Sequence, residues 1–409
     1  MIFLPRIAVP STPSMVTDEK TPLQAVGRLR IPSLVSPETG KLSTPVQAVL
    51  VYGAIRFIAF ATTALLLPHG RFRGIHHSLW SWMATGFDGS WYDRIAAHGY
   101  PHVYMYNWFP GYPAAMDAIA WIPGIGVNRA GPIVAIIAGL VAACGLARLG
   151  VTLTGDGRTG LLMVALWAVA PGSIVLIMAY AEALFCALAV WALVALTERR
   201  WVSAGILTLV AGTVRSTAVA LVAVVAVAAL ATLAESARTR SWSAASWRPV
   251  IAVLLAPLGL VAFWAFVAVR SQLPDGWLST EKDTGMSVDW GASLLRTAHT
   301  AFMNFASPFV MLTLLAIAAA VVLAAWSLTE RIPAYLHAYT LVVVGLAVLT
   351  SAYYLGSKPR FLLPAFLLTL PLAGMLARVR LYVLIPLIAI LAVASTWFGL
   401  FLASLGWAP

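Results

Sequence analysis

Carboxylates and aromatic rings are concentrated between residues 87 and 101, the first polar stretch after a long apolar run. The stretch contains Asp88 and Asp93, with Arg94 beside the second carboxylate. A carboxylate held next to a membrane can act as a general base, because a hydroxyl group must lose its proton as it attacks an electrophilic carbon. Asp93 could instead pair with Arg94 or cap the local helix. The stretch therefore supplies candidate bases for a group-transfer reaction.

Three basic residues later in the chain could stabilise a departing phosphate, whose growing negative charge needs cationic or N–H donors. They are Arg215, Lys358 and Arg360. An arginine inside an apolar run is costly unless it is paired or faces water, so Arg215 is a functional candidate. A structural ion pair with Glu182 is the alternative. Lys358 and Arg360 could also be interfacial residues whose charged ends extend into water.

The remaining reactive side chains favour neither a metal site nor a bound cofactor. The histidines between residues 69 and 102 lack the i, i+4 pair flanking a glutamate that is typical of zinc enzymes. Cys144 and Cys186 lie within apolar runs, where a thiol usually packs as a small hydrophobe. No metal site and no cofactor are predicted. The sequence shows no Gly-rich phosphate loop or nucleotide-binding fingerprint, which argues against a nucleotide-linked donor.

The composition identifies the kind of scaffold that must position these residues. Of 409 residues, 61% are hydrophobic and only 10% are charged, and the mean hydropathy is +0.89. This is too little polar material to cover a soluble globule, so an integral membrane protein is predicted. The net charge of +11 comes from basic residues scattered between apolar runs. That pattern indicates contact with anionic lipid in the bilayer and argues against nucleic acid as a partner.

The apolar runs predict an all-α polytopic membrane protein with about 10–12 transmembrane helices. Residues 111 to 123 are too few to cross alone and are expected to form an interfacial or re-entrant helix. Residues 202 to 234 are expected to form a hairpin of two half-length helices that turns near Arg215. The other runs of spanning length lie at 46–67, 130–152, 159–178, 183–198, 249–270, 301–326, 334–355, 361–377 and 381–403.

The basic residues also set an expected orientation, because cytosolic loops carry more Lys and Arg than outer loops. Residues 1–45 are rich in Pro, Ser and Thr and are predicted to be a disordered cytosolic tail. Residues 46–409 form a single transmembrane domain in this interpretation. Its first outer loop covers 69–129 and its second large outer loop covers 271–300. The polar segments around Asp88, Glu182, Arg215 and 358–360 then converge on the outer face.

Four motifs resemble those of a known enzyme family. The first outer loop contains Tyr-x-x-Ile-Ala-x-x-Gly-Tyr from residue 92, followed by Phe-Pro-x-Tyr-Pro from residue 109. Residues 179–185 read Ala-Tyr-Ala-Glu-Ala-Leu-Phe, and Arg215 is followed by serine. Together these motifs resemble the PIG-V-like family, the glycosylphosphatidylinositol mannosyltransferase 2 enzymes of the C-type glycosyltransferase superfamily. Phe87 stands where that family usually has Trp, and Ala181 where it usually has Ser.

The resemblance implies a C-type glycosyltransferase architecture with a catalytic first extracytoplasmic loop, and it implies that Asp88 is the catalytic general base. A lipid phosphate is already a good leaving group, so one base can suffice and no second carboxylic acid is required. The positions expected to bind substrate are Asp93, Tyr100, Tyr112, Tyr180, Glu182, Arg215, Lys358 and Arg360.

The expected activity is transfer of a hexose from a polyprenyl-phosphate-sugar donor to a glycolipid, glycan or protein acceptor. Mannose is the sugar that the resemblance implies. The protein is expected in the cell membrane, as a multi-pass protein with an extracytoplasmic active site. Two alternatives stay open: another lipid-linked sugar transferase, such as an arabinosyl or glucosyl enzyme, and a transporter or flippase of lipid-linked sugars. A transporter would place its ionisable residues near the bilayer midplane, on interrupted helices.

Overall fold

The computed structural model describes residues 43–67, 78–240, 247–272, 275–304 and 306–409. Residues 1–42 of the predicted tail and residues 69–77 of the predicted first outer loop lie outside these ranges. Nearly all secondary structure in the described ranges is helical, with one isolated antiparallel bridge between Val288 and Thr350. The helices are α1 (Thr44–Leu66), α2 (Leu79–Thr85), α3 (Asp88–His98), η1 (Val103–Asn107), α4 (Gly111–Ala120), α5 (Val127–Thr154), α6 (Gly157–Ala168), η2 (Ser173–Ile177), α7 (Glu182–Thr197), α8 (Trp201–Gly212), η3 (Ser216–Ala218), α9 (Val219–Arg238), α10 (Trp247–Leu255), α11 (Leu258–Ser271), α12 (Trp277–Asp283), α13 (Ala292–Met303), α14 (Pro308–Ser327), α15 (Ala334–Leu349), η5 (Ala352–Ser357), α16 (Lys358–Phe361), η6 (Phe366–Leu368), α17 (Thr369–Leu376) and α18 (Leu381–Ser404).

The helices confirm an all-α, multi-pass membrane protein. Within the described ranges, six helices are long and apolar enough to cross a membrane. A seventh crossing is possible if the pair at 355–361 and 366–376, bent by 83°, counts as one span. Three further apolar helices have 10–17 residues: α7, α8 and α15. The six or seven spans identified by length and composition are fewer than the 10–12 expected, because several predicted spans are short or broken.

Two of the predicted spans are interrupted by proline and glycine. The run at 159–178 was expected to be one helix, but α6 ends at Ala168 and η2 begins only at Ser173. Pro171 and Gly172 lie between them, and proline has no N–H with which to continue the helical hydrogen bonds. The run at 361–377 starts at the last residue of α16 and, after a break that contains Pro364, continues as η6 and α17.

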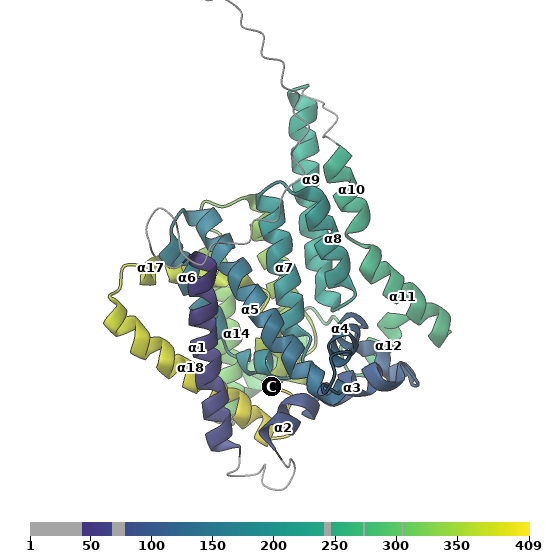
Figure 1. Cartoon of the computed structure of the whole chain (residues 1–409), viewed down its shortest axis with the longest axis vertical. Coiled ribbons are helices and arrows are strands. Elements are labelled where there is room, and N and C mark those ends of the chain that lie inside the picture. The colour runs from purple at the N-terminus through teal and green to yellow at the C-terminus, as the bar shows by residue number, and fades with distance from the viewer. Residues whose placement is uncertain (1–42, 68–77, 241–246, 273–274, 305) are drawn as a thin grey trace, which may run out of the picture.

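The stretch at 202–234 turns at Arg215 as expected, but its two arms are unequal. The first arm, α8, has 12 residues, whereas the continuous segment Ser216–Arg238 has 23 and qualifies as a full span. The prediction of two half-length helices was therefore wrong for the second arm. Helix α9 continues past residue 234 through Glu235 and ends at Arg238. It rises beyond the rest of the bundle in Figure 1.

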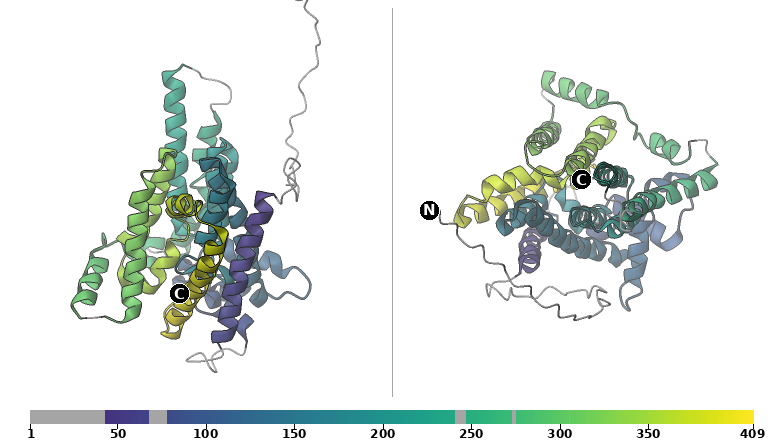
Figure 2. Two further views of the ribbon diagram at one scale, coloured as in Figure 1. Left: turned by 90° about the vertical axis from the view of Figure 1, so that its left-hand side faces the viewer. Right: turned by 90° about the horizontal axis from the view of Figure 1, so that it is seen from above.

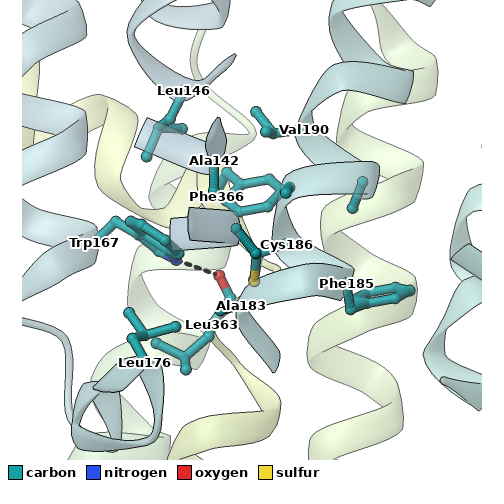
Figure 3. Packing of buried hydrophobic residues seen from close by; sticks show 14 of the residues in the cluster. Ala142, Leu146, Trp167, Leu176, Ala183, Phe185, Cys186, Val190, Leu363 and Phe366 are labelled. Carbon is teal, nitrogen blue, oxygen red and sulfur yellow. Dashed lines mark hydrogen bonds between the residues drawn. The ribbon is translucent and has the colours of Figure 1, made fainter. Parts of the chain in front are cut away.

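The core is built around α5, which packs against α1, α6 and α7 (Figure 1). Small residues along α5 allow this close approach, as is common between membrane helices. Figure 2 shows α1 and α18 side by side at the edge of the same group. In the interior, the Trp167 indole donates a hydrogen bond to the Leu363 carbonyl, 3.1 Å away (Figure 3). This bond joins α6 to the break after α16.

An arginine in the first span stabilises the break between α6 and η2. Arg56 of α1 is buried and donates to the Ser173 carbonyl at 2.6 Å and to the Ala168 carbonyl. The Ser173 hydroxyl lies 3.0 Å from the hydroxyl of Ser395 in α18. Carbonyl groups at a broken helix end lack helical partners and must be satisfied inside the protein when lipid surrounds it. Arg56 therefore holds three elements together at the break.

The short polar helices gather at one end of the bundle. Figure 1 shows α2, α3, α4 and α12 at its lower end with the C-terminus, whereas the tops of α9 and α10 lie at the opposite end. Helix α12 belongs to the predicted second outer loop and packs against η1 of the first. The two predicted outer loops thus meet at the same end.

Candidate functional site

A cavity of about 1100 Å³ lies where these polar segments meet. Its walls come from α3, η1, the turn before α9, α12, the segment around α16 and the C-terminal residues. The lining residues are Phe87, Asp88, Ser90, Trp91, Tyr92, Tyr104, Asn107, Trp108, Phe109, Val214, Arg215, Ser216, Glu281, Thr284, Met286, Tyr353, Ser357, Arg360, Phe361, Leu405, Gly406, Trp407 and Ala408.

Asp88 is held at the rim of this cavity by the start of α3. It is the first residue of that helix, where a carboxylate is favoured by the positive end of the helix dipole. The preceding residue, Phe87, has a φ of 51°, a region that non-glycine residues rarely occupy. The Asp88 carboxylate does not cap its own helix. Its Oδ2 instead forms an ion pair of 2.8 Å with Nη2 of Arg360.

The bent helix pair at 355–361 and 366–376 carries the Arg360 backbone against the break after α6. This position brings the Arg360 side chain within reach of Asp88. Gly172 has a φ of 81°, and a Cβ on that residue would lie 2.8 Å from the Arg360 backbone nitrogen. The contact therefore requires glycine. The Arg360 side chain is only 8% exposed. Its Nη1 has no hydrogen-bond acceptor among the described residues. A buried guanidinium N–H without an acceptor favours an anionic ligand at this position.

A second ion pair lies beside the first. Glu182, the first residue of α7, places Oε1 at 2.7 Å from Nη1 of Arg215. The same oxygen lies 3.5 Å from Nε of Arg360, within ion-pair distance but without the geometry of a hydrogen bond. The turn that carries Arg215 is fixed by the Gly111 N–H, which donates to the Thr213 carbonyl at 2.7 Å. Charges therefore alternate from Asp88 through Arg360 and Glu182 to Arg215, with Glu182 buried behind the cavity wall.

Aromatic rings flank both guanidinium groups. The Tyr180 ring lies 4.9 Å from the Arg360 guanidinium carbon. The Phe361 ring lies 5.3 Å from that atom and 5.7 Å from the guanidinium carbon of Arg215. Rings attract cations through their negative faces, and this attraction increases when water is excluded. The rings thus offset part of the cost of burying the two guanidinium groups.

Another aromatic cluster, formed by Trp91, Tyr104 and Trp108, lines a different part of the cavity. Trp91 stacks on Trp108 with 5.1 Å between ring centroids, and it meets Tyr104 edge to face at 5.2 Å. The guanidinium of Arg94 lies 5.2 Å from the Trp91 ring. We refer to Trp91, Tyr104 and Trp108 as the ring platform.

The three predicted tyrosines pack behind the cavity. Tyr112 is fully buried and donates to the Gly131 carbonyl at 2.7 Å. Tyr100 donates to the Trp108 carbonyl at 2.6 Å and so supports the ring platform. Tyr180 is buried beneath Arg360. Each of the three therefore contacts or supports a group near the cavity without being among its lining residues.

Lys358 and Asp93 also lie outside the set of lining residues. The Lys358 ammonium donates to the Ala347 carbonyl at 2.6 Å and the Thr350 carbonyl at 2.9 Å, and so caps the end of α15. Asp93 is half-buried on α3, and burial raises the pKa of its carboxyl above the ordinary value, opposed by His98 and Arg94. Of the nine site residues predicted from the sequence, the cavity is lined by Asp88, Arg215 and Arg360.

The structure adds residues that the sequence did not single out as site residues. Glu281 of α12 lines the cavity, and burial raises the pKa of its carboxyl to about 7, opposed by the charge of Arg215. Trp91 and Trp407 line it as well. The polar composition of the 271–300 loop was a signal for Glu281, but that loop carries several carboxylates and nothing in the sequence ranks them. Among the described residues, no three His, Cys, Asp or Glu side chains are grouped as metal ligands would be.

Comparison with known proteins finds similar solved structures but no match in sequence. No protein-family model matches the chain, and no curated protein matches its sequence. A crystal structure of ArnT from Cupriavidus metallidurans bound to undecaprenyl phosphate is similar, with a TM-score of 0.49, 13% sequence identity and coverage of 81% of this chain. The chain spans 60% of the length of that protein. The chemistry of the cavity has to be derived from its own residues.

Proposed function

We propose that this protein is a membrane glycosyltransferase of C-type architecture that transfers a hexose from a polyprenyl-phosphate donor to a glycolipid, glycan or protein acceptor. Mannose is the expected sugar, from the resemblance of the 92–100, 109–113 and 179–185 motifs to the PIG-V-like family. The cavity faces the extracytoplasmic side of the cell membrane in this proposal. The transmembrane domain is residues 46–409, and residues 1–45 are a cytosolic tail.

One observation carries the proposal: a carboxylate suited to general-base catalysis meets a guanidinium with a free N–H at one cavity wall. Asp88 and Arg360 lie 2.8 Å apart, and Nη1 of Arg360 has no acceptor within the described ranges. Transfer from a lipid phosphate needs both groups, since a proton must leave the acceptor and negative charge must be stabilised on the phosphate. A cavity of about 1100 Å³ has room for a donor sugar and an acceptor sugar together.

The reaction then proceeds in one displacement. Asp88 takes the proton of the acceptor hydroxyl as its oxygen forms a bond to the anomeric carbon. The bond between that carbon and the phosphate oxygen breaks, and both of its electrons leave with the polyprenyl phosphate. Arg360 and Arg215 stabilise the phosphate charge, and Glu182 holds the two guanidinium groups in place. A single displacement of this kind inverts the configuration at the anomeric carbon.

The other predicted positions contribute indirectly in this proposal. Tyr180 supports Arg360 from below, and Tyr100 supports the ring platform. Tyr112 contacts the Tyr92 ring at 4.8 Å and so fixes one cavity wall. Lys358 caps α15 and fixes the segment that carries Arg360. Asp93 lies on α3 outside the cavity lining, so a substitution of Asp93 is the matched control for the same substitution of Asp88.

The Asp88→Asn variant tests the proposal. It keeps the size and hydrogen-bonding capacity of the side chain but removes its basicity. We expect turnover to fall at least about a hundredfold with donor binding retained, in line with general-base contributions of about 10²–10⁴. Asp93→Asn, on the same helix, should be much milder. The readout is transfer of labelled sugar from polyprenyl-phosphate mannose, with mass-spectrometric comparison of glycolipids from cells with and without the gene product. Wild-type turnover in Asp88→Asn would remove Asp88 as the base.

The broken helices favour one alternative function, a transporter or flippase of lipid-linked sugars. Interrupted helices with buried charges at their ends are typical of transporters, and Glu182 and Arg360 lie next to two such breaks. The functions differ in their products. A flippase moves a labelled lipid-linked sugar across sealed vesicles without forming a new glycosidic bond. Movement without transfer would favour the flippase.

A further inference from the structure

The cavity has a second carboxyl group that the proposed reaction does not use. Glu281 of α12 lines the cavity that Asp88, Arg215 and Arg360 also line. Within the described part of the chain, no hydrogen bond or ion pair of its carboxylate is found, whereas Asp88 and Glu182 are both paired with arginine. Glu281 is half-buried, and its carboxylate keeps unused hydrogen-bonding capacity toward the cavity, so a ligand hydroxyl is a natural partner.

Helix α12 holds Glu281 in a defined position. Its first residue, Trp277, stacks on Trp264 of α11 at 5.8 Å and meets Phe109 edge to face at 5.7 Å. The Met286 N–H donates to the Glu281 carbonyl at 3.0 Å and closes the turn after the helix. The same helix packs against η1, which carries Tyr104 of the ring platform. Glu281 and the ring platform are therefore fixed on neighbouring elements of one wall.

The charged groups that line the cavity differ in their partners. Arg215 and Arg360 are each paired with a carboxylate, and each has an aromatic ring on its guanidinium group. Among the described residues, Glu281 lines the same cavity without such a pair, and the ring platform lines it from α3, η1 and the segment after η1. A sugar ring has an apolar C–H face and a polar hydroxyl edge, which suit an aromatic surface and a carboxyl group respectively. An anionic sugar would be repelled by the Glu281 carboxylate.

We propose that Glu281 and the ring platform form the acceptor subsite and that this subsite takes a neutral sugar ring. The sugar packs against the ring platform, and one of its hydroxyl groups donates to the Glu281 carboxylate while a neighbouring hydroxyl faces Asp88. The inference rests on the proposed transferase function and assigns the acceptor class: a neutral glycan or glycolipid headgroup, as opposed to a uronic acid or a phosphorylated sugar.

The ionisable groups that face Glu281 are those of the cavity and of its own helix. Arg215, Asp88 and Arg360 share the cavity, and Tyr92 and Tyr104 face it from α3 and η1. On α12 itself, Lys282 is paired with Asp275 at 3.5 Å, and Asp283 is exposed. Asp283 is not a lining residue, so it provides a matched control on the same helix.

Binding of a soluble probe tests the subsite without turnover. Methyl α-mannopyranoside does not enter micelles, and its dissociation constant for the purified full chain in detergent can be measured by saturation-transfer NMR at pH 8. We expect Glu281→Gln to weaken binding at least about tenfold, the effect of losing a hydrogen bond to a charged group. Trp91→Leu should weaken binding because it removes the ring that Tyr104 and Trp108 both contact, whereas Asp283→Asn should not change it. Methyl glucuronide should bind the wild-type protein at least tenfold more weakly than the mannoside.

Transfer assays separate this inference from the proposed function. With polyprenyl-phosphate mannose as donor and octyl α-mannopyranoside as acceptor, Glu281→Gln should raise the acceptor KM about tenfold and leave the donor KM unchanged. Asp88→Asn should lose transfer but bind methyl mannoside normally. Unchanged mannoside binding in both Glu281→Gln and Trp91→Leu, or equal binding of the glucuronide, would overturn the acceptor subsite. Normal mannoside selectivity in a protein without transferase activity would contradict the proposed function alone.

Discussion

Glu182 should contribute more to the stability of the fold than either arginine that it contacts. It is 1% exposed, and its Oε1 lies 2.7 Å from Arg215 and 3.5 Å from Arg360. Breaking a buried ion pair by removing one partner costs about 3–5 kcal/mol, because an uncompensated charge stays behind. Glu182→Gln leaves Arg215 without a carboxylate and Arg360 with Asp88 alone. We therefore expect a loss of about 3–5 kcal/mol in the free energy of unfolding.

Arg215→Met should cost less than Glu182→Gln. The remaining Glu182 carboxylate keeps Arg360 within ion-pair distance, and the Arg215 side chain is 18% exposed and so partly hydrated already. We expect the free energy of unfolding to fall by about 3 kcal/mol, the lower end of the range for a broken buried ion pair. The exposed Arg331, in the loop before α15, provides the control: Arg331→Ala should change stability by no more than about 0.5 kcal/mol.

Chemical unfolding in detergent measures all three variants, and the double variant Glu182→Gln with Arg215→Met completes a mutant cycle. Removing both partners eliminates the unpaired charge, so the double variant should be less destabilised than the sum of the single variants. The reasoning is refuted if Glu182→Gln lies within 0.5 kcal/mol of wild type, or if Arg215→Met proves the more damaging change. Turnover is measured only on protein that remains folded, so loss of fold and loss of activity stay separate.

Three other predictions concern positions away from this pair. Arg56→Met should lower the unfolding temperature and reduce turnover in folded protein, because the carbonyls of Ala168 and Ser173 lose their donor; unchanged values of both would show that the break does not need Arg56. Single cysteines at the exposed positions Arg200 and Tyr353 should label from opposite sides of the membrane, with position 353 outside, and labelling from one side would contradict the proposed orientation. Burial raises the pKa of Glu281 to about 7, so its stabilising effect is present below about pH 4.5 and lost as the pH rises through 7. Glu281→Gln should therefore unfold at a higher temperature than wild type at pH 8, with the difference shrinking at pH 5.

The continuous spans were predictable because length and hydropathy determine them. The runs predicted at 46–67, 130–152 and 381–403 correspond to α1, α5 and α18 with ends that agree within three residues. Spans interrupted by proline or glycine were not predictable in the same way, since an average over hydropathy does not respond to one break. Pro171 with Gly172 is the clearest case, because the apolar run continues past both residues.

The residues of the cavity were only partly predictable, for a different reason. Asp88 and Arg360 are far apart in the sequence, and only the folded chain brings them to 2.8 Å. Arg56 carried the same signal as Arg215, a lone arginine in an apolar run, but it contacts backbone carbonyls at a helix break and not a carboxylate. Glu281 differs from the other carboxylates of its loop in that it lines the cavity, and only the folded position of α12 places it there.

The arrangement of charges connects the two broken helices to the proposed chemistry. Arg360 lies between two carboxylates, Asp88 at 2.8 Å and Glu182 at 3.5 Å, and its Nη1 is left without an acceptor. A donor phosphate at that N–H would compete with Asp88 for the same guanidinium, while Glu182 would continue to hold it. Asp88 and the donor phosphate would then share one cationic partner when the donor is in place. The break at Gly172 matters for this reason: it lets the Arg360 backbone approach closely enough for one guanidinium to serve both the base and the leaving group.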